Sequence, residues 1–118
     1  MNIDVHSHFF PIDAFRNANR YRDKAPRFTL EKNGRYSVFC QGGKRGSLIS
    51  GAYDPQARAN DLDQMGIDIQ VLSPSPILLY YWDSLDSAAY FSRVQNEGIH
   101  AATTVLPERF WYCSFARR

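Results

Sequence analysis

Apolar and polar residues alternate in two short stretches of the chain. In the first stretch Ile3 and Val5 stand between polar neighbours, and residues 67–72 repeat the pattern with β-branched side chains. A period of two is typical of a β-strand, so strands are expected over residues 2–7 and 67–72. A third strand is expected over residues 110–115, where an unbroken run of large side chains indicates burial on both faces.

Two helices are expected between these strands. The first spans residues 55–65, because Asp54 can cap its free N–H groups and Pro55 suits the first helical position. Gly66 then suits a left-handed helix end. The second helix spans residues 84–106 and ends before a proline. The side chains expected to face the core are Ala57, Leu62 and Met65 in the first helix, and Leu85, Ala88, Phe91 or Val94, Ala102 and Val105 in the second.

The stretch between the first strand and the first of these helices has no regular period. A short helix is expected over residues 12–18. A β-hairpin follows, in which residues 28–31 and 36–39 flank an Asn-Gly pair that supplies the positive backbone angles of a tight turn. The glycine-rich residues 42–46 predict a flexible loop.

These elements follow one another as strand, long excursion, helix, strand, helix and strand. Such alternation predicts an α/β fold built from parallel β-α-β units. The first two strands also share apolar residues on one face and polar residues on the other. This pattern fits barrel strands, whose apolar side meets the surrounding helices.

The composition is that of a folded chain without a nucleic-acid or membrane signature. Of its 118 residues 44% are hydrophobic and 14% aromatic, so one domain over residues 1–118 is expected. The formal net charge of +2 is small and the basic residues are spread out, so we expect no nucleic-acid partner. No stretch reaches the roughly 18 apolar residues of a membrane span, and the first residues do not resemble a signal peptide. Cys40 and Cys113 form no metal-knuckle or disulfide pattern, so the cytoplasm is the expected location.

The segment His6-Ser7-His8 ends the first strand and carries the candidate chemistry. Residues two apart on a strand project to the same face, roughly 7 Å apart at their Cα atoms, so two imidazoles can converge on one cation. Barrel enzymes place catalytic groups at this carboxyl end of their strands. Asp4 lies on the same face and is expected to orient a histidine or to pair with a neighbouring strand. The pair therefore predicts a metal site, the alternative being two exposed histidines.

Three segments carry a resemblance to a known family. They are residues 3–11, Ile-Asp-Val-His-Ser-His-Phe-Phe-Pro; residues 62–76, Leu-Asp-Gln-Met-Gly-Ile-Asp-Ile-Gln-Val-Leu-Ser-Pro-Ser-Pro; and Asn96 on the long helix together with residues 106–110, Leu-Pro-Glu-Arg-Phe. In this order they resemble the amidohydrolase-related family that includes aminocarboxymuconate-semialdehyde decarboxylase and the resorcylate-type decarboxylases. The His-x-His motif alone is unspecific, whereas the three segments in series are specific.

The resemblance implies a TIM-type (β/α)8 barrel with an inserted hairpin after its first strand, in residues 12–53. A complete barrel takes about 250 residues, so this chain would supply its N-terminal portion of about three β-α units. In the family both histidines of the motif bind metal, so His6 and His8 inherit that role, with Zn²⁺ as the expected ion. The remaining ligands and the catalytic histidine come from later strands, and His100 is interpreted as a helix-surface residue instead.

Two further residues are candidates for substrate binding. The decarboxylases hold a substrate carboxylate with an arginine of the inserted segment, and the resemblance places Arg45 near that position. The planar guanidinium suits this task because it offers two parallel donors, although a solvated loop arginine remains the alternative. Trp82 and its neighbours Tyr80 and Tyr81 follow the second barrel strand, where loops line an active-site mouth. They are expected to pack on an aromatic substrate, or else to form local core or a subunit contact.

The leading interpretation is an N-terminal fragment of a metal-dependent enzyme, inactive alone. Its reaction would be the non-oxidative decarboxylation of a small aromatic or muconate-type carboxylic acid. The alternatives are a hydrolase of the same superfamily, a truncated chain that binds a full-length homologue, and a small α/β binding protein with an incidental His-x-His motif. Open sheet edges also predict a marginally stable chain or a homo-oligomer.

Overall fold

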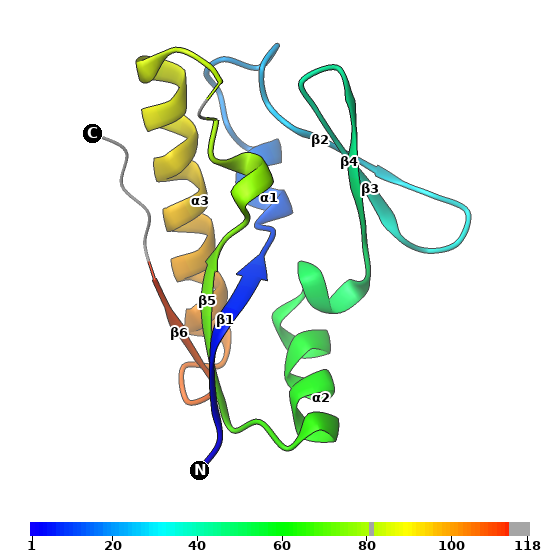
Figure 1. Cartoon of the computed structure of the whole chain (residues 1–118), viewed down its shortest axis with the longest axis vertical. Coiled ribbons are helices and arrows are strands. Elements are labelled where there is room, and N and C mark those ends of the chain that lie inside the picture. The colour runs from blue at the N-terminus through cyan, green and yellow to red at the C-terminus, as the bar shows by residue number, and fades with distance from the viewer. Residues whose placement is uncertain (81, 114–118) are drawn as a thin grey trace.

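A parallel three-stranded sheet forms the centre of the computed structural model, which describes residues 1–80 and 82–113 (Figure 1). Strand β1 (Ile3–Phe9) pairs with β5 (Ile69–Pro74), and β5 pairs with β6 (Phe110–Tyr112). The sheet order is therefore β1-β5-β6. This confirms the expected parallel α/β arrangement, which is compatible with part of a (β/α)8 barrel.

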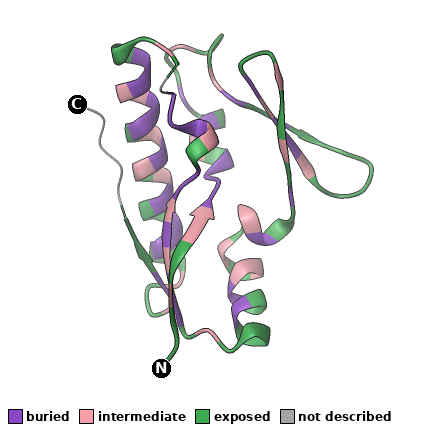
Figure 2. Ribbon diagram, viewed as in Figure 1, coloured by how far each residue is buried: buried purple, intermediate pink, exposed green. Residues whose placement is uncertain are grey.

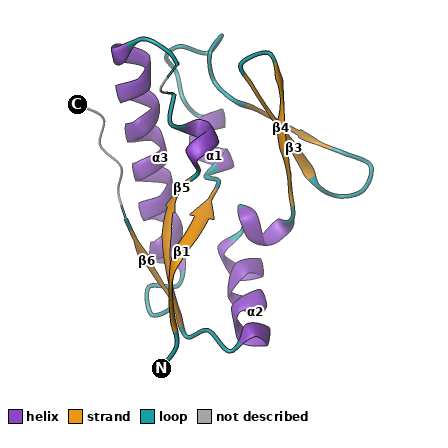
Figure 3. Ribbon diagram, in the orientation of Figure 1, coloured by secondary structure: helices purple, strands orange, loops and turns teal. Residues whose placement is uncertain are grey.

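Helix α2 (Pro55–Met65) has the ends that its flanking residues predict. A side-chain oxygen of Asp54 accepts a hydrogen bond from the Gln56 N–H at 3.0 Å, and Gly66 closes the helix at a φ of 71°. Leu62 is buried as expected, whereas Met65 is exposed. The helix precedes β5, as the ribbon in Figure 3 shows.

Helix α3 (Leu85–Val105) joins β5 to β6, and its N-terminal Ser84 Oγ accepts the Ser87 N–H at 3.3 Å. Of its expected core positions, Ala88, Phe91 and Ala102 are buried. The expectation was wrong for Leu85 and Val105, which are 57% and 58% exposed at the two ends of the helix. Neighbouring residues at these ends, such as Ala88 and Ala102, are buried, so Leu85 and Val105 lie on the exposed side of the helix. No helix of the described residues is both long enough and apolar enough to cross a bilayer.

A separate antiparallel sheet follows the short helix α1 (Ile12–Arg16). It consists of β2 (Arg27–Leu30), β3 (Tyr36–Cys40) and β4 (Gly43–Leu48) in that order. The two segments expected to form a hairpin are paired: β2 lies antiparallel to β3 through a turn that contains Gly34 at a φ of 81°. Single 3-10 turns, Ser50–Ala52 and Pro76–Leu78, precede α2 and follow β5.

The expected flexible loop over residues 42–46 is wrong. Gly43 already pairs with Cys40 across a tight turn, and β4 continues along β3 as far as Leu48. Gly46 and its polar neighbours show no apolar alternation, so this strand follows from pairing with β3 and is not visible as a local pattern.

Two groups of buried side chains hold these sheets to the helices, and Figure 2 shows where buried residues lie along α2, α3 and the central strands. The first, which we call the aromatic core, consists of Phe10, Ile12, Phe15, Phe28, Val38, Cys40, Leu48, Leu78, Tyr80, Ala88 and Phe91. The second, the sheet core, consists of Phe9, Ala59, Leu62, Leu72, Ile99, Ala102 and Phe110.

Strand β6 differs from its expected form. Burial on both faces holds for Phe110, which is 2% exposed, but not for Trp111 and Tyr112, which are 53% and 42% exposed. The strand lies at an end of the sheet, and in the described chain its one sheet partner is β5. Residues 114–115 of the expected strand lie outside the described residues.

Candidate functional site

His6 and His8 lie together at the carboxyl end of β1. Their ring centroids are 5.2 Å apart, with the rings at 73° to each other. The geometry is not that of a plain strand, because Asp4 pairs with Gln70 whereas Ser7 pairs with Leu72. Strand β1 therefore holds one more residue than β5 between these pairs, which is a bulge. The two rings lie close together, as expected, and the bulge is an addition to the expected structure.

The ring of His8 is held by the end of β5. Its Nδ1 lies 3.1 Å from the carbonyl oxygen of Pro74 and 3.3 Å from Ser73 Oγ. A carbonyl oxygen only accepts, so this hydrogen bond places the proton on Nδ1 and leaves Nε2 as the basic nitrogen. A histidine whose second ring nitrogen donates to a carbonyl is typical of metal sites.

Asp4 bonds to the neighbouring strand, which is one of its two expected roles. Its Oδ2 accepts the Gln70 side-chain amide at 2.8 Å, and its Oδ1 accepts the backbone N–H of His6 at 3.0 Å. These two bonds, that from Gln70 above all, hold the pKa of the Asp4 carboxyl below its ordinary value, because they favour the ionised form. Asp4 therefore contacts the backbone of His6.

Arg58 on α2 joins this cluster from the helix side. Its Nη1 donates to Gln70 Oε1 at 2.8 Å, its Nη2 to the carbonyl of His8 at 2.6 Å and its Nε to the carbonyl of Gly51 at 2.8 Å. The guanidinium also lies over the ring of Phe9, 5.4 Å from its centroid. Burial lowers the pKa of Arg58 to about 10, so this side chain remains a cation at neutral pH.

The two imidazoles fit part of a metal site. Within residues 1–80 and 82–113 there is no group of three His, Cys, Asp or Glu side chains placed to hold a metal ion. Catalytic zinc sites usually have three protein ligands, so His6 and His8 alone would leave such a site incomplete. The third histidine, His100, is exposed on α3 and packs against Tyr112, with ring centroids 5.0 Å apart.

Arg45 lies on β4, within the antiparallel sheet. Its Nε donates to the carbonyl of Cys40 at 3.0 Å, and its Nη2 lies 3.5 Å from Gln41 Oε1. Cys40 is the last residue of β3, and Gln41 begins the turn that leads to β4. In the described chain no hydrogen bond joins Arg45 to either histidine.

Trp82 stacks on Tyr80, with ring centroids 5.2 Å apart, and is 42% exposed. It lines a surface pocket with Cys40, Gln41 and the basic residues Arg22, Lys24 and Arg27. Arg45 is linked to this pocket through its contacts with Cys40 and Gln41, and it is not itself one of the described residues that line it. Tyr81, the third expected aromatic residue, lies outside the described residues.

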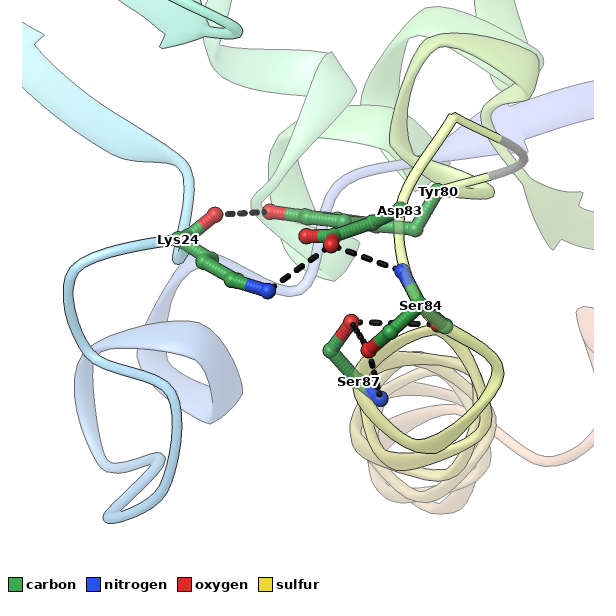
Figure 4. Close-up of polar contacts among 5 residues, drawn as sticks. All are labelled: Lys24, Tyr80, Asp83, Ser84 and Ser87. Atoms are coloured by element: carbon green, nitrogen blue, oxygen red, sulfur yellow. Dashed lines mark hydrogen bonds and ion pairs between the residues drawn. The ribbon is translucent and has the colours of Figure 1, made fainter.

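Polar contacts join Lys24, Tyr80 and Asp83, which line this pocket, and Figure 4 shows these contacts. Lys24 Nζ pairs with Asp83 Oδ1 at 2.8 Å, and the same oxygen accepts the Ser84 N–H at 2.7 Å. The Tyr80 hydroxyl donates to the Lys24 carbonyl at 2.8 Å, and burial raises the pKa of this phenol, so it stays protonated. These contacts join the N-terminus of α3 to the segment that leads into β2.

Sequence reasoning missed Arg58, Gln70 and Ser73 as parts of the histidine cluster. A signal existed for Ser73, because the carboxyl ends of adjacent parallel strands meet at one edge of a sheet. Arg58 and Gln70 carried no such signal, since a polar residue on a helix or a strand is usually solvated.

Comparison with family models finds no match for this chain. Among curated proteins, the chain is 37% identical over 67 residues to a 2-amino-3-carboxymuconate-6-semialdehyde decarboxylase of Dictyostelium discoideum. The aligned part covers 53% of this chain and 18% of that enzyme, so the chain spans less than a fifth of the relative's length. This partial similarity is to an enzyme of the kind that the three sequence segments resemble, and it supports an amidohydrolase-like relationship.

Proposed function

We propose that the chain is the N-terminal part of a metal-dependent amidohydrolase-type barrel enzyme, in which His6 and His8 supply the first two ligands of a Zn²⁺ ion. The observation that carries the proposal is the pairing of the two imidazoles, with ring centroids 5.2 Å apart, at the carboxyl end of a parallel sheet. The bond between His8 Nδ1 and Pro74 supports it, because it leaves Nε2 for a metal.

The proposed reaction is the non-oxidative decarboxylation of an aromatic or muconate-type carboxylic acid. The partial similarity to a decarboxylase supports this reaction class. A bound divalent ion would polarise the substrate and lower the pKa of a bound water. Hydrolysis by the same kind of site is the alternative within the superfamily.

Arg45 and Trp82 are the proposed substrate contacts. The guanidinium of Arg45 would bind a carboxylate, and the partly exposed face of Trp82 would pack on an aromatic or conjugated group. The contacts of Arg45 with Cys40 and Gln41, which line the same pocket as Trp82, support a joint role. In this proposal the antiparallel sheet is an insertion in the barrel that carries the carboxylate contact towards the substrate.

The proposed zinc site also requires further metal ligands, which the described residues of this chain do not supply. The described chain offers two imidazoles where catalytic zinc takes three protein ligands, so we expect weak metal binding and no turnover by the chain alone. We further propose that the protein acts in the cytoplasm.

A second candidate function is binding to a longer homologue, or to a second copy, through a sheet edge. It is favoured by Val5 and Trp111 on the outer strands, which are 75% and 53% exposed. Sedimentation velocity of the chain alone and mixed with the Dictyostelium enzyme tests this candidate. A monomer in both samples would contradict it.

Zinc titration tests the main proposal. The chain should bind Zn²⁺, and His6→Ala and His8→Ala should each weaken binding by at least about tenfold, because each removes a direct ligand. His100→Ala is the matched control, since His100 lies on the surface of α3, and it should leave the affinity unchanged. Equal affinities in the wild type and the His6→Ala variant would contradict the proposal.

A further inference from the structure

A series of hydrogen bonds, partly buried at Arg58 and Gln70 and exposed at its far end, runs from α2 to the backbone of His6. Arg58 donates to Gln70 Oε1 at 2.8 Å, Gln70 Nε2 donates to Asp4 Oδ2 at 2.8 Å, and Asp4 Oδ1 accepts the His6 N–H at 3.0 Å. Gln70 is 5% exposed, so water competes little for the two bonds that its side chain makes, to Arg58 and to Asp4. A second branch runs directly from Arg58 Nη2 to the carbonyl of His8 at 2.6 Å.

The first branch ends at the β1 bulge. The register of β1 on β5 shifts between Asp4 and Ser7, so His6 lies in the stretch that does not follow regular pairing. Its N–H is bonded to the Asp4 carboxylate. Bulges re-aim the side chains that they carry, so the direction of the His6 ring depends on how Asp4 is held.

The direction of each hydrogen bond in this series explains why Arg58, Gln70 and Asp4 are all needed. Arg58 can only donate, so it requires Oε1 of Gln70 to face it. The amide group of Gln70 must then turn its Nε2 towards Asp4, where a carboxylate can only accept. Without Arg58 the Gln70 amide could rotate and present its oxygen to Asp4, which would repel the carboxylate and release the bulge.

Building on the proposed metal role of the two histidines, we propose that Arg58 and Gln70 are positioning residues of that site. They hold the β1 bulge, through Asp4, in the conformation that brings the imidazoles of His6 and His8 together. Arg58 also fixes the carbonyl of His8 directly, so one helix side chain sets the backbone at both ligands.

The test uses the whole chain with two matched glutamine variants. Gln70→Met keeps roughly the same side-chain volume but removes the two side-chain hydrogen bonds of Gln70, to Arg58 and to Asp4. Gln95→Met is the control, because Gln95 is also fully buried but bonds to the carbonyl of Leu78, away from the histidines. Zn²⁺ affinity is measured by competition with a chromophoric chelator, and the thermal midpoint by circular dichroism.

Gln70→Met should weaken Zn²⁺ binding by about tenfold or more, the size of effect found for residues that orient metal ligands. Gln95→Met should keep the wild-type affinity even where its thermal midpoint falls as far. With Co²⁺ in place of Zn²⁺, Gln70→Met should also change the visible absorption spectrum, because the arrangement of the ligands changes. A loss of stability alone would not produce that spectral change.

The possible outcomes separate this inference from the proposed function. If His6→Ala and His8→Ala bind Zn²⁺ as the wild type does, or the wild type does not bind it, the metal site itself fails and the inference fails with it. If both histidine variants lose binding while Gln70→Met retains the affinity and Co²⁺ spectrum of Gln95→Met, the metal site stands. The positioning role of Gln70 and Arg58 is then overturned.

Discussion

The aromatic core and the sheet core are held together by different kinds of contact. In the aromatic core Phe91 lies at the centre of packed rings, 4.5 Å from the centroid of Tyr80 and 6.2 Å from that of Phe15. Its polar contacts, such as the pair of Lys24 and Asp83, lie at the rim. Beside the sheet core a polar group lies directly on the apolar side chains, because the guanidinium of Arg58 lies over the ring of Phe9.

The two regions therefore have different roles: the aromatic core chiefly stabilises the fold, whereas the hydrogen bonds around Arg58 chiefly fix the positions of atoms near the histidines. Apolar burial is not directional, so it contributes free energy without placing any one atom closely. Hydrogen bonds fix atoms to within a few tenths of an ångström but contribute only about 1 kcal/mol each on balance. Substitutions in the aromatic core should therefore lower the free energy of unfolding, whereas those around Gln70 should chiefly alter metal affinity.

Phe91→Ala should have the largest effect on stability. Phe91 is fully buried, and truncation of such a side chain typically costs about 3–5 kcal/mol. Urea denaturation followed by circular dichroism measures the loss. Leu85→Ala, at a position that is 57% exposed on the same helix, should change the stability by less than about 0.5 kcal/mol. Equal losses in the two variants would contradict the packing that defines the aromatic core.

Gly98→Ala should have a smaller effect. A β-carbon at Gly98 would lie 2.5 Å from Pro11 Cβ and 2.7 Å from Ala14 Cβ, so α1 and α3 would have to separate. Overpacking costs about 1–3 kcal/mol, and the higher helix propensity of alanine returns about 1 kcal/mol of that. Thermal denaturation should show a net loss that adding Ala14→Gly partly restores. A more stable Gly98→Ala variant would show that the two helices are not in close contact.

Asp83→Asn should have the smallest effect, and one that depends on pH. The bond from Lys24, above all, and that from the Ser84 N–H hold the pKa of Asp83 below its ordinary value. The resulting stabilisation is complete above the ordinary pKa and is lost as the pH falls through the lowered one. The wild type should exceed the variant in stability at neutral pH, and the gap should close in acid. Glu108→Gln, at an exposed carboxylate, is the control; a gap that persists at the lowest pH would contradict the ion pair.

The parts of the fold that could be predicted are those determined by residues close to one another in the sequence. Asp54, Pro55 and Gly66 define α2 within a dozen positions, and their cap geometries are those expected. That His6 and His8 lie close together could be predicted from their spacing of two on a strand, but the bulge that carries His6 could not.

The remaining features depend on residues that are distant in sequence. Strand β4 exists because β3 offers it partners, and no apolar pattern marks Gly43 to Leu48. The bulge follows from the register between β1 and β5, and the bond between Gln70 and Asp4 joins residues 66 positions apart. Contacts of this kind depend on which strands are neighbours in the folded sheet, so they are seen in the structure and not in the sequence.

The central claim is that His6 and His8 bind one metal ion together, and X-ray absorption at the zinc edge tests it most directly. The zinc-loaded chain should show two imidazole ligands at about 2.0–2.1 Å, with oxygen ligands completing the shell. The His6→Ala variant should show one imidazole fewer. A spectrum without imidazole scattering, or one that is identical in the two proteins, would contradict the claim.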